Sequence, residues 1–336
     1  MQPYPLLMTP YFRHGGETPW GGALLRDAFG KPAPDGPVGE SLEVSALPGR
    51  ESVVRNGELA GRTLSEVLAL WGEALTGQPG GEFPLLLKLL DAREPLSVQV
   101  HPGDEYALEH EGKPGKSEAW VVLSAEPGAT LCCGLRDGAP PLDRLAESGE
   151  IENWLNWVDA RPGDVFYLPN GTVHALGAGL VCYEIQQPSD ATYRVWDWGR
   201  VGADGRPRDL HVEKALDVSV PGRRLSKARG ATELVEGGSA THYILDKHFQ
   251  LSRLNVSGTM PLPAGRMLLL TPIAPMTLFW PGGGLALSPF DCALVPAGLR
   301  GAALDGDGWA LCSALPDRER LERALGGRIA DVAGEI

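Results

Sequence analysis

The chain has 336 residues, of which 43% are hydrophobic and 22% are charged, a balance typical of globular proteins rather than of disordered chains or membrane proteins. The length suits two modest domains or one large one. Asp and Glu number 43 against 30 Lys and Arg, and the formal charge of −13 leads us to expect no nucleic-acid partner and no membrane partner.

The N-terminal residues 1–16 predict no export signal, because they lack a basic start and prolines interrupt their apolar stretch. No later run approaches the roughly 18 apolar residues of a membrane span. Five cysteines, with Cys132 and Cys133 adjacent, contain no CxxC pair and leave an odd count, which is a poor basis for disulfides. We therefore expect a cytoplasmic protein.

Short apolar segments separated by glycine and proline dominate the chain, and the clearest of them in the first half predict strands at 83–92, 96–102 and 117–125. Helical periodicity is convincing only at 63–75, 141–158, 209–219 and 317–327. A second strand-rich stretch begins near His242, after a basic, glycine-rich segment at 221–239 that we interpret as a connection. The predicted fold class is mainly β with a few peripheral helices, in domains at 1–235 and 236–336.

The spacing G-x5-P-x-G-x2-H is present at Gly163, Pro169, Gly171 and His174. Gly163 can turn the chain into a strand, the proline and second glycine can form a tight bend, and the returning strand then points His174 inward. This pattern resembles the second conserved box of the cupins, which are jelly-roll-like β-barrels. A lone histidine in a strand is more often a core residue than a ligand, but the turn residues here favour a ligand.

Further ligand-type side chains precede this motif. Gln99 and His101 are two residues apart, so on an extended strand both side chains leave the same face. Glu118 follows after enough residues for a loop and a return on a neighbouring strand. With His174 these groups can converge on one divalent cation, for which zinc is the first choice. The alternative is that His101 is an exposed loop residue and Glu118 a surface carboxylate.

The second half repeats part of the motif without its histidine. Pro296 and Gly298 match the proline and the second glycine, but Gly301 stands where the histidine would be. No histidine occurs after His248. We therefore expect a degenerate C-terminal cupin domain that lacks metal ligands and that packs against the first domain or shapes its pocket.

Most of the chain resembles the type I mannose-6-phosphate isomerases, also called phosphomannose isomerases. The matching blocks are PWGGALL (19–25), the segment 39–68, FPLLLKLLDAREPLSVQVHPGDEYA (83–107), GKSEAWVVL (115–123), YLPNGTVHALGAGLVCYEIQQPSDATYRVWDWGR (167–200) and PRDLHVEKAL (207–216). The interval between Glu118 and His174 leaves no room for the helical insertion of longer members, so the chain resembles the compact bacterial form with two cupin domains. Leu42, Ser117 and Ala119 depart from the family's common residues, but none of these changes removes a ligand.

This resemblance implies a set of ligands for one zinc ion per chain: Gln99, His101, Glu118 and His174. It places the family's active-site arginine at Arg194 and the lysine that precedes the glutamate ligand at Lys116. Arg194 can bind phosphate or an enediolate oxygen through two parallel hydrogen bonds, or it can pair with Asp190 or Asp197 instead.

The candidates for acid and base catalysis are Lys116, Glu184 and Asp190, of which Asp190 and Lys116 are favoured. Lys88 lies within an apolar run and points either into the barrel, as a substrate-binding group, or out to solvent.

The reaction that the resemblance implies is the interconversion of D-mannose 6-phosphate and D-fructose 6-phosphate through a cis-enediol. A proton moves between C2 and C1, which requires a base, and a metal can stabilise the enediolate oxygen or orient the sugar hydroxyls. Two alternatives stay open: a non-catalytic regulatory cupin that binds sugar phosphates, and another cupin enzyme such as a metal dioxygenase. The implied partner is a small-molecule sugar phosphate, and we expect a monomer or a homodimer.

Overall fold

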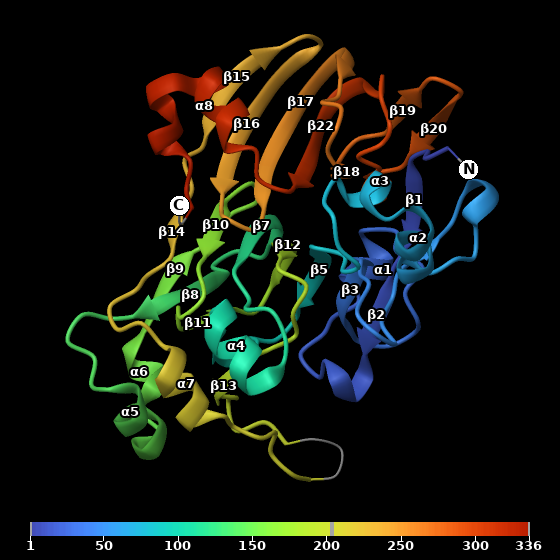
Figure 1. The fold of residues 1–336 in the computed structure, drawn as a ribbon. Coiled ribbons are helices and arrows are strands. Elements are labelled where there is room, and N and C mark those ends of the chain that lie inside the picture. The colour runs from blue at the N-terminus through green and yellow to red at the C-terminus, as the bar shows by residue number, and fades with distance from the viewer. Residues whose placement is uncertain (1, 202–204, 335–336) are drawn as a thin grey trace. The chain divides into compact units, whose positions relative to one another are not determined.

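Strands are the main elements of the computed structural model, which describes residues 2–201 and 205–334. They form three sheets, with helices at a few places along the chain (Figure 1). The expected mainly β class is therefore confirmed. The chain divides into two compact units, which we call the central unit (12–41 and 88–227) and the terminal unit (1–11, 42–87 and 228–336).

Each of these units is assembled from separate stretches of the chain. The expected division, by contrast, separates the chain into two continuous domains between 235 and 236. β1 (Leu6–Thr9) pairs with both β21 (Ala293–Val295) and β4 (Val53–Val54), so N-terminal strands belong to the sheet of the terminal unit. Such pairing between the two ends of a chain leaves no local signal in a sequence.

The segment 221–239 contains the boundary between the two units, at 227 and 228, which agrees with its interpretation as a connection, but it also contains strands. β14 (Ser226–Lys227) pairs with β10 (Val165–Leu168), and β15 (Ala231–Val235) pairs with β16 (Gly238–Leu245). Both strands are short, and β15 is only partly buried, which explains why no apolar pattern marks them.

The central unit contains two antiparallel layers. The larger sheet has the order β14-β10-β7-β12-β5-β3-β2. Besides β14 and β10, its strands are β7 (Glu118–Ala125), β12 (Leu180–Gln186), β5 (Leu86–Ala92), β3 (Val38–Val44) and β2 (Tyr11–His14). The smaller sheet has the order β13-β6-β11-β8-β9, with bounds Tyr193–Trp196, Val98–Val100, His174–Leu176, Thr130–Leu135 and Leu155–Asp159.

Side chains alternate between two hydrophobic clusters across the smaller sheet. Cys133 and Leu176 join residues of the larger sheet, such as Trp120, in a cluster between the two sheets. Cys132 and Ala175 face the other way, into a second cluster that contains residues of α5 (Leu142–Ser148), α6 (Ile151–Trp154) and α7 (Val212–Val218). Figure 1 shows these three helices together. The face toward the larger sheet is therefore the interior of the barrel.

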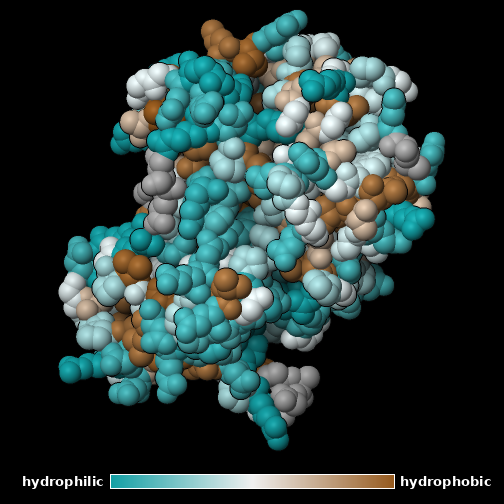
Figure 2. Space-filling view, viewed as in Figure 1, coloured by the Kyte–Doolittle hydropathy of each residue, from teal (hydrophilic) through white to brown (hydrophobic). Residues whose placement is uncertain are grey.

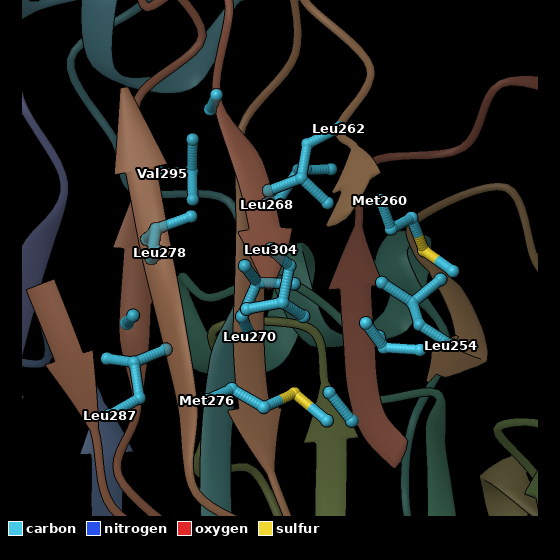
Figure 3. Close-up of a cluster of buried hydrophobic side chains, with 14 of the residues drawn as sticks. Leu254, Met260, Leu262, Leu268, Leu270, Met276, Leu278, Leu287, Val295 and Leu304 are labelled. Atoms are coloured by element: carbon cyan, nitrogen blue, oxygen red, sulfur yellow. The ribbon is translucent and has the colours of Figure 1, made fainter. Parts of the chain in front are cut away.

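The terminal unit is a ten-stranded sheet around one apolar cluster (Figure 3). Its remaining strands are β17 (Gln250–Pro261), β18 (Leu268–Pro272), β19 (Met276–Trp280), β20 (Gly283–Leu287) and β22 (Ala303–Ala314). The helix predicted at 63–75 is present as α2 (Leu64–Trp71) and α3 (Glu73–Thr76), and Gly72 interrupts it. Thr63 and Glu66 form a capping box at the start of α2.

Three other α-helices and three short 3-10 helices (Gly15–Glu17, Gly57–Leu59 and Gly326–Asp331) complete the described elements. α8 (Arg318–Leu325) agrees with the helix predicted at 317–327, whereas α1 (Leu24–Asp27) and α4 (Asp104–Glu111) were not predicted. Within the described ranges, no helix is both long and apolar enough to cross a membrane. Most of the surface seen in Figure 2 is hydrophilic, and hydrophobic residues occur there as separate patches.

Candidate metal centre and active site

The smaller sheet of the central unit aligns three candidate side chains in one row. β11 lies between β6 and β8, and His174 is paired with Gln99 on one side and with Cys133 on the other. Arg194 on β13 is in turn paired with Gln99. Directly paired residues of antiparallel strands project to the same face. Because Cys133 faces the barrel interior, Gln99, His174 and Arg194 also leave the sheet on that side.

The bend before β11 has the backbone conformation that the motif predicts. Gly171 has a φ of 76°, a region that favours glycine, and its N–H donates to the carbonyl of His101 at 2.8 Å. A Cβ at this position would lie 2.8 Å from Val220 Cγ2 and 2.9 Å from the carbonyl oxygen of Val218. The glycine therefore allows a close approach of the turn to its neighbours and ties it to His101.

His101, Glu118 and His174 form a group whose ligand atoms are close enough to hold one metal ion. These atoms lie within 4.8 Å of one another, and all three residues are buried. His101 Nε2 is 3.4 Å from Glu118 Oε2, and His174 Nε2 is 3.3 Å from Glu118 Oε1. The carboxylate thus bridges two imidazoles whose ring centres are 4.8 Å apart.

Backbone carbonyl groups fix the orientation of both imidazole rings. His101 Nδ1 is 3.0 Å from the carbonyl oxygen of Ala191, and His174 Nδ1 is 2.8 Å from that of Thr172. A carbonyl oxygen only accepts, so we assign the proton of each ring to Nδ1 and a lone pair to each Nε2. Metal-bound histidines ordinarily have this outer hydrogen bond, which aims Nε2 at the ion.

The Glu118 carboxylate has one oxygen for which the protein supplies no donor. Oε2 accepts a hydrogen bond from Lys116 Nζ, whereas Oε1 is buried and has no hydrogen-bond partner within the described ranges. A buried polar atom without a partner is costly and needs an explanation. A cation between Glu118 and the two imidazoles would satisfy Oε1. The residues present therefore fit a bound metal ion.

The protonation states at this site also suit a metal ion. Burial raises the pKa of Glu118, but Lys116 and His101 outweigh this effect and hold that pKa well below its ordinary value. Burial, followed by the charge of Lys116, lowers the pKa of His101 to about 3. At neutral pH Glu118 is thus an anion and His101 is neutral, which are the forms that bind metals.

Gln99 lies beside this cluster with its amide nitrogen directed toward it. Nε2 is 3.3 Å from His174 Nε2, and Oε1 accepts a hydrogen bond from Ser97 Oγ at 3.4 Å. Rotation of the amide by half a turn would direct its oxygen, the atom that binds cations, to the same point.

Lys116 completes the set of sequence-predicted residues that the fold brings together. Its Nζ lies 2.9 Å from His101 Nε2 and donates to Glu118, and the side chain is 5% exposed. The five residues now in one place are Gln99, His101, Lys116, Glu118 and His174.

Trp120 connects this cluster to a second group of charges. Its ring meets that of His174 edge-on, with centres 5.6 Å apart, and its Nε1 donates to Glu184 Oε1 at 2.8 Å. Lys88 Nζ is 3.0 Å from Glu184 Oε2. Lys88 therefore points into the barrel and not to solvent.

Two residues that the sequence analysis missed, Arg13 and Glu40, continue this group. Lys88 Nζ is 3.7 Å from Glu40 Oε2, and Arg13 Nη1 is 3.0 Å from Glu40 Oε1. Burial lowers the pKa of Lys88, but Glu184 and Glu40 outweigh it and raise that pKa. Burial raises the pKa of Glu40, but Lys88 and Arg13 outweigh it and lower that pKa. Glu40 and Lys88 therefore stay charged at neutral pH.

Arg194 belongs to a basic group at the end of β13. Its Nη1 donates to the carbonyl of Asp209 at 2.8 Å, and its Nε is buried without a hydrogen-bond partner among the residues described. Arg200 and Arg208 each pair with Asp197 at 2.6 Å. Burial, and then the charge of Arg208, lower the pKa of Arg194. The positive charge of these three arginines thus exceeds the negative charge of Asp197 in this group.

Asp190 is placed differently from the other acid and base candidates. Its Oδ1 pairs with Lys113 Nζ at 2.6 Å, and the two side chains are 42% and 48% exposed. The neighbouring residue, Ala191, supplies the carbonyl that holds His101. Asp190 is therefore adjacent in sequence to a residue that contacts His101, but its carboxylate is paired with Lys113 near the surface.

The missed residues differ in the signal that could have found them. Glu40 lies in a strand whose residues are all buried, and a charged residue in a buried strand invites a search for an internal partner. Arg200 and Arg208 flank a segment, 202–204, outside the described residues, and only their common partner Asp197 reveals them. No local pattern marks Arg13.

Comparison with a family model adds an independent observation. The model described as "Phosphomannose isomerase type I, catalytic domain" matches residues 15–117. This range includes Glu40, Lys88, Gln99, His101 and Lys116, and it ends one residue before Glu118.

Named relatives extend the similarity over nearly the whole chain. The mannose-6-phosphate isomerase of Streptococcus mutans is 37% identical over 291 residues, which are 86% of this chain and 92% of the relative. The mannose-6-phosphate isomerase ManA of Bacillus subtilis is 38% identical over 319 residues, 90% of this chain and 96% of the relative. The crystal structure of a mannose 6-phosphate isomerase from Bacillus subtilis superposes with a TM-score of 0.86 at 32% identity and covers 93% of this chain and 99% of that one.

Proposed function

The chain belongs to the type I phosphomannose isomerase family, and we propose that its isomerase reaction takes place in the barrel of the central unit, around His101, Glu118 and His174. As an isomerase of this family it interconverts mannose 6-phosphate and fructose 6-phosphate. The observation that carries the proposed location is the buried oxygen Oε1 of Glu118, which has no donor within the described ranges and lies beside an imidazole nitrogen.

We infer that the ion is zinc, one per chain, and that its ligands are Gln99, His101, Glu118 and His174. Two neutral imidazoles, one carboxylate and one amide oxygen suit a borderline divalent cation. When bound, the ion supplies Lewis acidity toward the substrate oxygen that becomes negative during the reaction. The hydrogen bonds that the imidazoles donate to the carbonyl groups of Ala191 and Thr172 support this role, because they orient the rings independently of the ion.

The isomerisation needs a group that accepts a proton from one sugar carbon and returns it to the next. Lys116 is the candidate for this role with the best-supported position. Its Nζ lies beside the Nε2 of His101 and the carboxylate of Glu118, inside the barrel and almost without solvent exposure. Nζ can accept this proton only as the neutral amine, and a proton then held there would stay close to the substrate atoms beside His101 and Glu118.

The other two candidates have partners that favour different roles. Glu184 is held by Lys88 and Trp120, so its carboxylate suits the binding of sugar hydroxyl groups better than proton transfer. Asp190 would have to leave Lys113 before it could act on a substrate inside the barrel.

The phosphate group of the substrate requires a positive subsite, because the net charge of the chain is −13. Arg194 and its neighbours Arg200 and Arg208 supply one, since Asp197 offsets only part of their charge. Buried nitrogens of Arg194 and Arg200 have no hydrogen-bond partner among the residues described, and phosphate oxygens are good acceptors for such donors.

The proposal of a cytoplasmic location rests on the free thiols of the cysteines. All five lie within the described residues and all are free, which suits a reducing compartment. The substrate is a small sugar phosphate, and the choice between a monomer and a homodimer stays a prediction.

The test is a coupled assay on the full-length protein. Mannose 6-phosphate is added, auxiliary enzymes convert the fructose 6-phosphate onward, and nicotinamide reduction is followed before chelation, after chelation, and after addition of zinc. The same assay and a metal analysis are applied to His101→Ala, His174→Ala and Arg194→Ala. His110→Ala is the matched control, because His110 is an exposed histidine on α4.

We expect chelation to abolish turnover and zinc to restore it. The His101 and His174 variants should lose both metal and activity, Arg194→Ala should keep the metal and lose activity, and the control should keep both. Full turnover by either ligand variant would refute the proposed site. Turnover that resists chelation in protein without bound metal would refute the proposed cofactor.

A further inference from the structure

The sheet of the terminal unit encloses a small cavity, separate from the residues proposed for isomerisation. Its volume is about 70 Å³, and its walls come from β16, β17, β22 and the loop that follows β17. His242 is paired with Ser252, and Ser252 with Cys312, so these three side chains project to the same face of the sheet. Polar groups are therefore built into the interior of an otherwise apolar barrel.

Apolar, polar and cationic side chains line the cavity. The apolar ones include Leu254, Met260 and Leu262, which Figure 3 shows along one side of the hydrophobic cluster. Arg266 and Arg320 also line it, whereas no acidic side chain among the described residues does. A cavity with two guanidinium groups and apolar walls is suited to an amphipathic anion.

The carboxylate of Glu233 does not line the cavity and already has two partners. Its Oε1 accepts a hydrogen bond from Arg320 and is 2.9 Å from His242 Nε2. His242 Nδ1 is 2.7 Å from Ser252 Oγ. We assign the imidazole proton to Nε2 because Glu233 can only accept there, and the Ser252 hydroxyl then donates to Nδ1. This chain of bonds holds Arg320 in place but supplies no negative charge inside the cavity.

Arg266 is incompletely compensated by its protein partners. It donates to the carbonyl of Leu315 and to Asp317 Oδ2 at 3.2 Å, and it is 3.5 Å from Gln250 Oε1. The Arg266 side chain is 13% exposed, whereas that of Asp317 is 36% exposed and therefore more hydrated. Burial lowers the pKa of Arg266 despite Asp317, and Arg320 adds to the lowering. A buried cation in this state is stabilised by an added anion.

We propose that this cavity is a second ligand site, for a short-chain monocarboxylate whose carboxylate meets Arg266 and Arg320 and whose chain packs on Leu254, Met260 and Leu262. Guanidinium groups bind carboxylates through paired hydrogen bonds. A cavity needs roughly 10–15 Å³ of volume open to the centre of a water molecule to hold one water, so this cavity has room for about five to seven non-hydrogen atoms. The apolar part of its lining offers no donors to a fully hydrated anion such as phosphate and favours a carboxylate with a hydrocarbon tail.

The site is tested on the full-length protein by calorimetric titration with butyrate. n-Butanol shares the chain length without the charge, and inorganic phosphate shares the charge without the chain. We expect saturable butyrate binding with a rise in Tm, and binding of n-butanol weaker by about tenfold or more. Phosphate is expected not to displace butyrate. The absence of butyrate binding, equal binding of n-butanol, or displacement by phosphate would overturn the proposal.

Variants locate the bound probe. Arg320→Gln should weaken butyrate binding by about tenfold or more, since it removes one charge-assisted contact. Arg323→Gln is the matched control on the same helix, because Arg323 is 70% exposed and does not line the cavity. Ala314→Val fills the cavity without changing any charge and should also abolish binding, while isomerase turnover stays unchanged. Equal weakening by the control, or undiminished binding by Ala314→Val, would refute this site.

Discussion

Replacement of Lys88 by methionine is the sharpest test of the ionic group inside the central barrel. Lys88 lies between Glu184 and Glu40, and both side chains are nearly or fully buried. Methionine keeps much of the length and apolar stem of lysine but removes the ammonium. The buried carboxylates of Glu184 and Glu40 would then lose the cation that they share. Glu184 would keep its hydrogen bond from Trp120, and Glu40 would keep its ion pair with Arg13.

The cost follows from the desolvation of these carboxylates. Removal of one partner from a buried ion pair costs about 3–5 kcal/mol, because the remaining charge is left uncompensated. The matched control is Lys227→Met, which breaks the pair of Lys227 with Asp164 at 2.7 Å, where the side chains are 44% and 21% exposed. Such an exposed pair contributes only about 0–1 kcal/mol. The same replacement is therefore expected to cost about 3–5 kcal/mol at Lys88 and only about 0–1 kcal/mol at Lys227.

The loss should depend on pH in a defined direction. The pKa of Glu40 is lowered in the folded protein, so its stabilisation is present above its unfolded pKa and is lost as pH falls through the folded value. The pKa of Lys88 is raised, so its stabilisation is present below its unfolded pKa and is lost as pH rises through the folded value. The pair is thus fully stabilising at pH 7, and the cost of Lys88→Met should shrink in acid.

Denaturant unfolding at pH 7 and at acidic pH measures these differences for both variants. Addition of Glu184→Gln and Glu40→Gln to the methionine variant should recover stability, because no unpaired carboxylate is left. A loss at pH 7 no larger than that of Lys227→Met would refute the reasoning. A loss that grows in acid would refute the assigned charges.

Two further changes address the turn and the phosphate subsite. Gly171→Ala should destabilise the protein more than Gly163→Ala in thermal unfolding. Both residues have positive φ, but only at Gly171 would a Cβ meet neighbours, including the carbonyl of Val218 at 2.9 Å. Equal losses of stability would exclude this close approach. Arg200→Gln should raise KM for mannose 6-phosphate by roughly tenfold to a hundredfold with little change in kcat, since it removes a charge-assisted contact made throughout the reaction. Arg161→Gln, at an exposed arginine, serves as its control, and an unchanged KM for Arg200→Gln would remove this residue from the subsite.

Local geometry made much of the site predictable. The two-residue spacing of Gln99 and His101 and the turn before His174 restrict these groups to one neighbourhood, because a strand alternates its faces and the bend returns the chain. Glu118, at the start of β7, follows from the length of chain that allows a loop and a return on a neighbouring strand. Lys116 was placed by the resemblance to the family and not by a local rule.

Other features depend on contacts between distant segments. Every residue of β5 is buried, so the apolar run around Lys88 contains no alternation that could assign the lysine to one face. Arg13 and Glu40 pair across a turn and a helix, and β1 pairs with a strand near the other end of the chain. Such pairings depend on complementary charge or register at long separation, and a single sequence does not reveal them.

The polar row on the inner face of the central barrel explains why its smaller sheet benefits from a second apolar layer on the outer face. The inward row contains Gln99, His174 and Arg194, which contribute little hydrophobic stabilisation and require partners. The same strands turn Val98, Ala175 and Val195 outward into a cluster with residues of α5, α6 and α7. Each completely buried aliphatic side chain contributes roughly 1.5–3 kcal/mol relative to exposure. The helices thus stabilise the sheet from its outer face and leave its inner face available for ligands and charges.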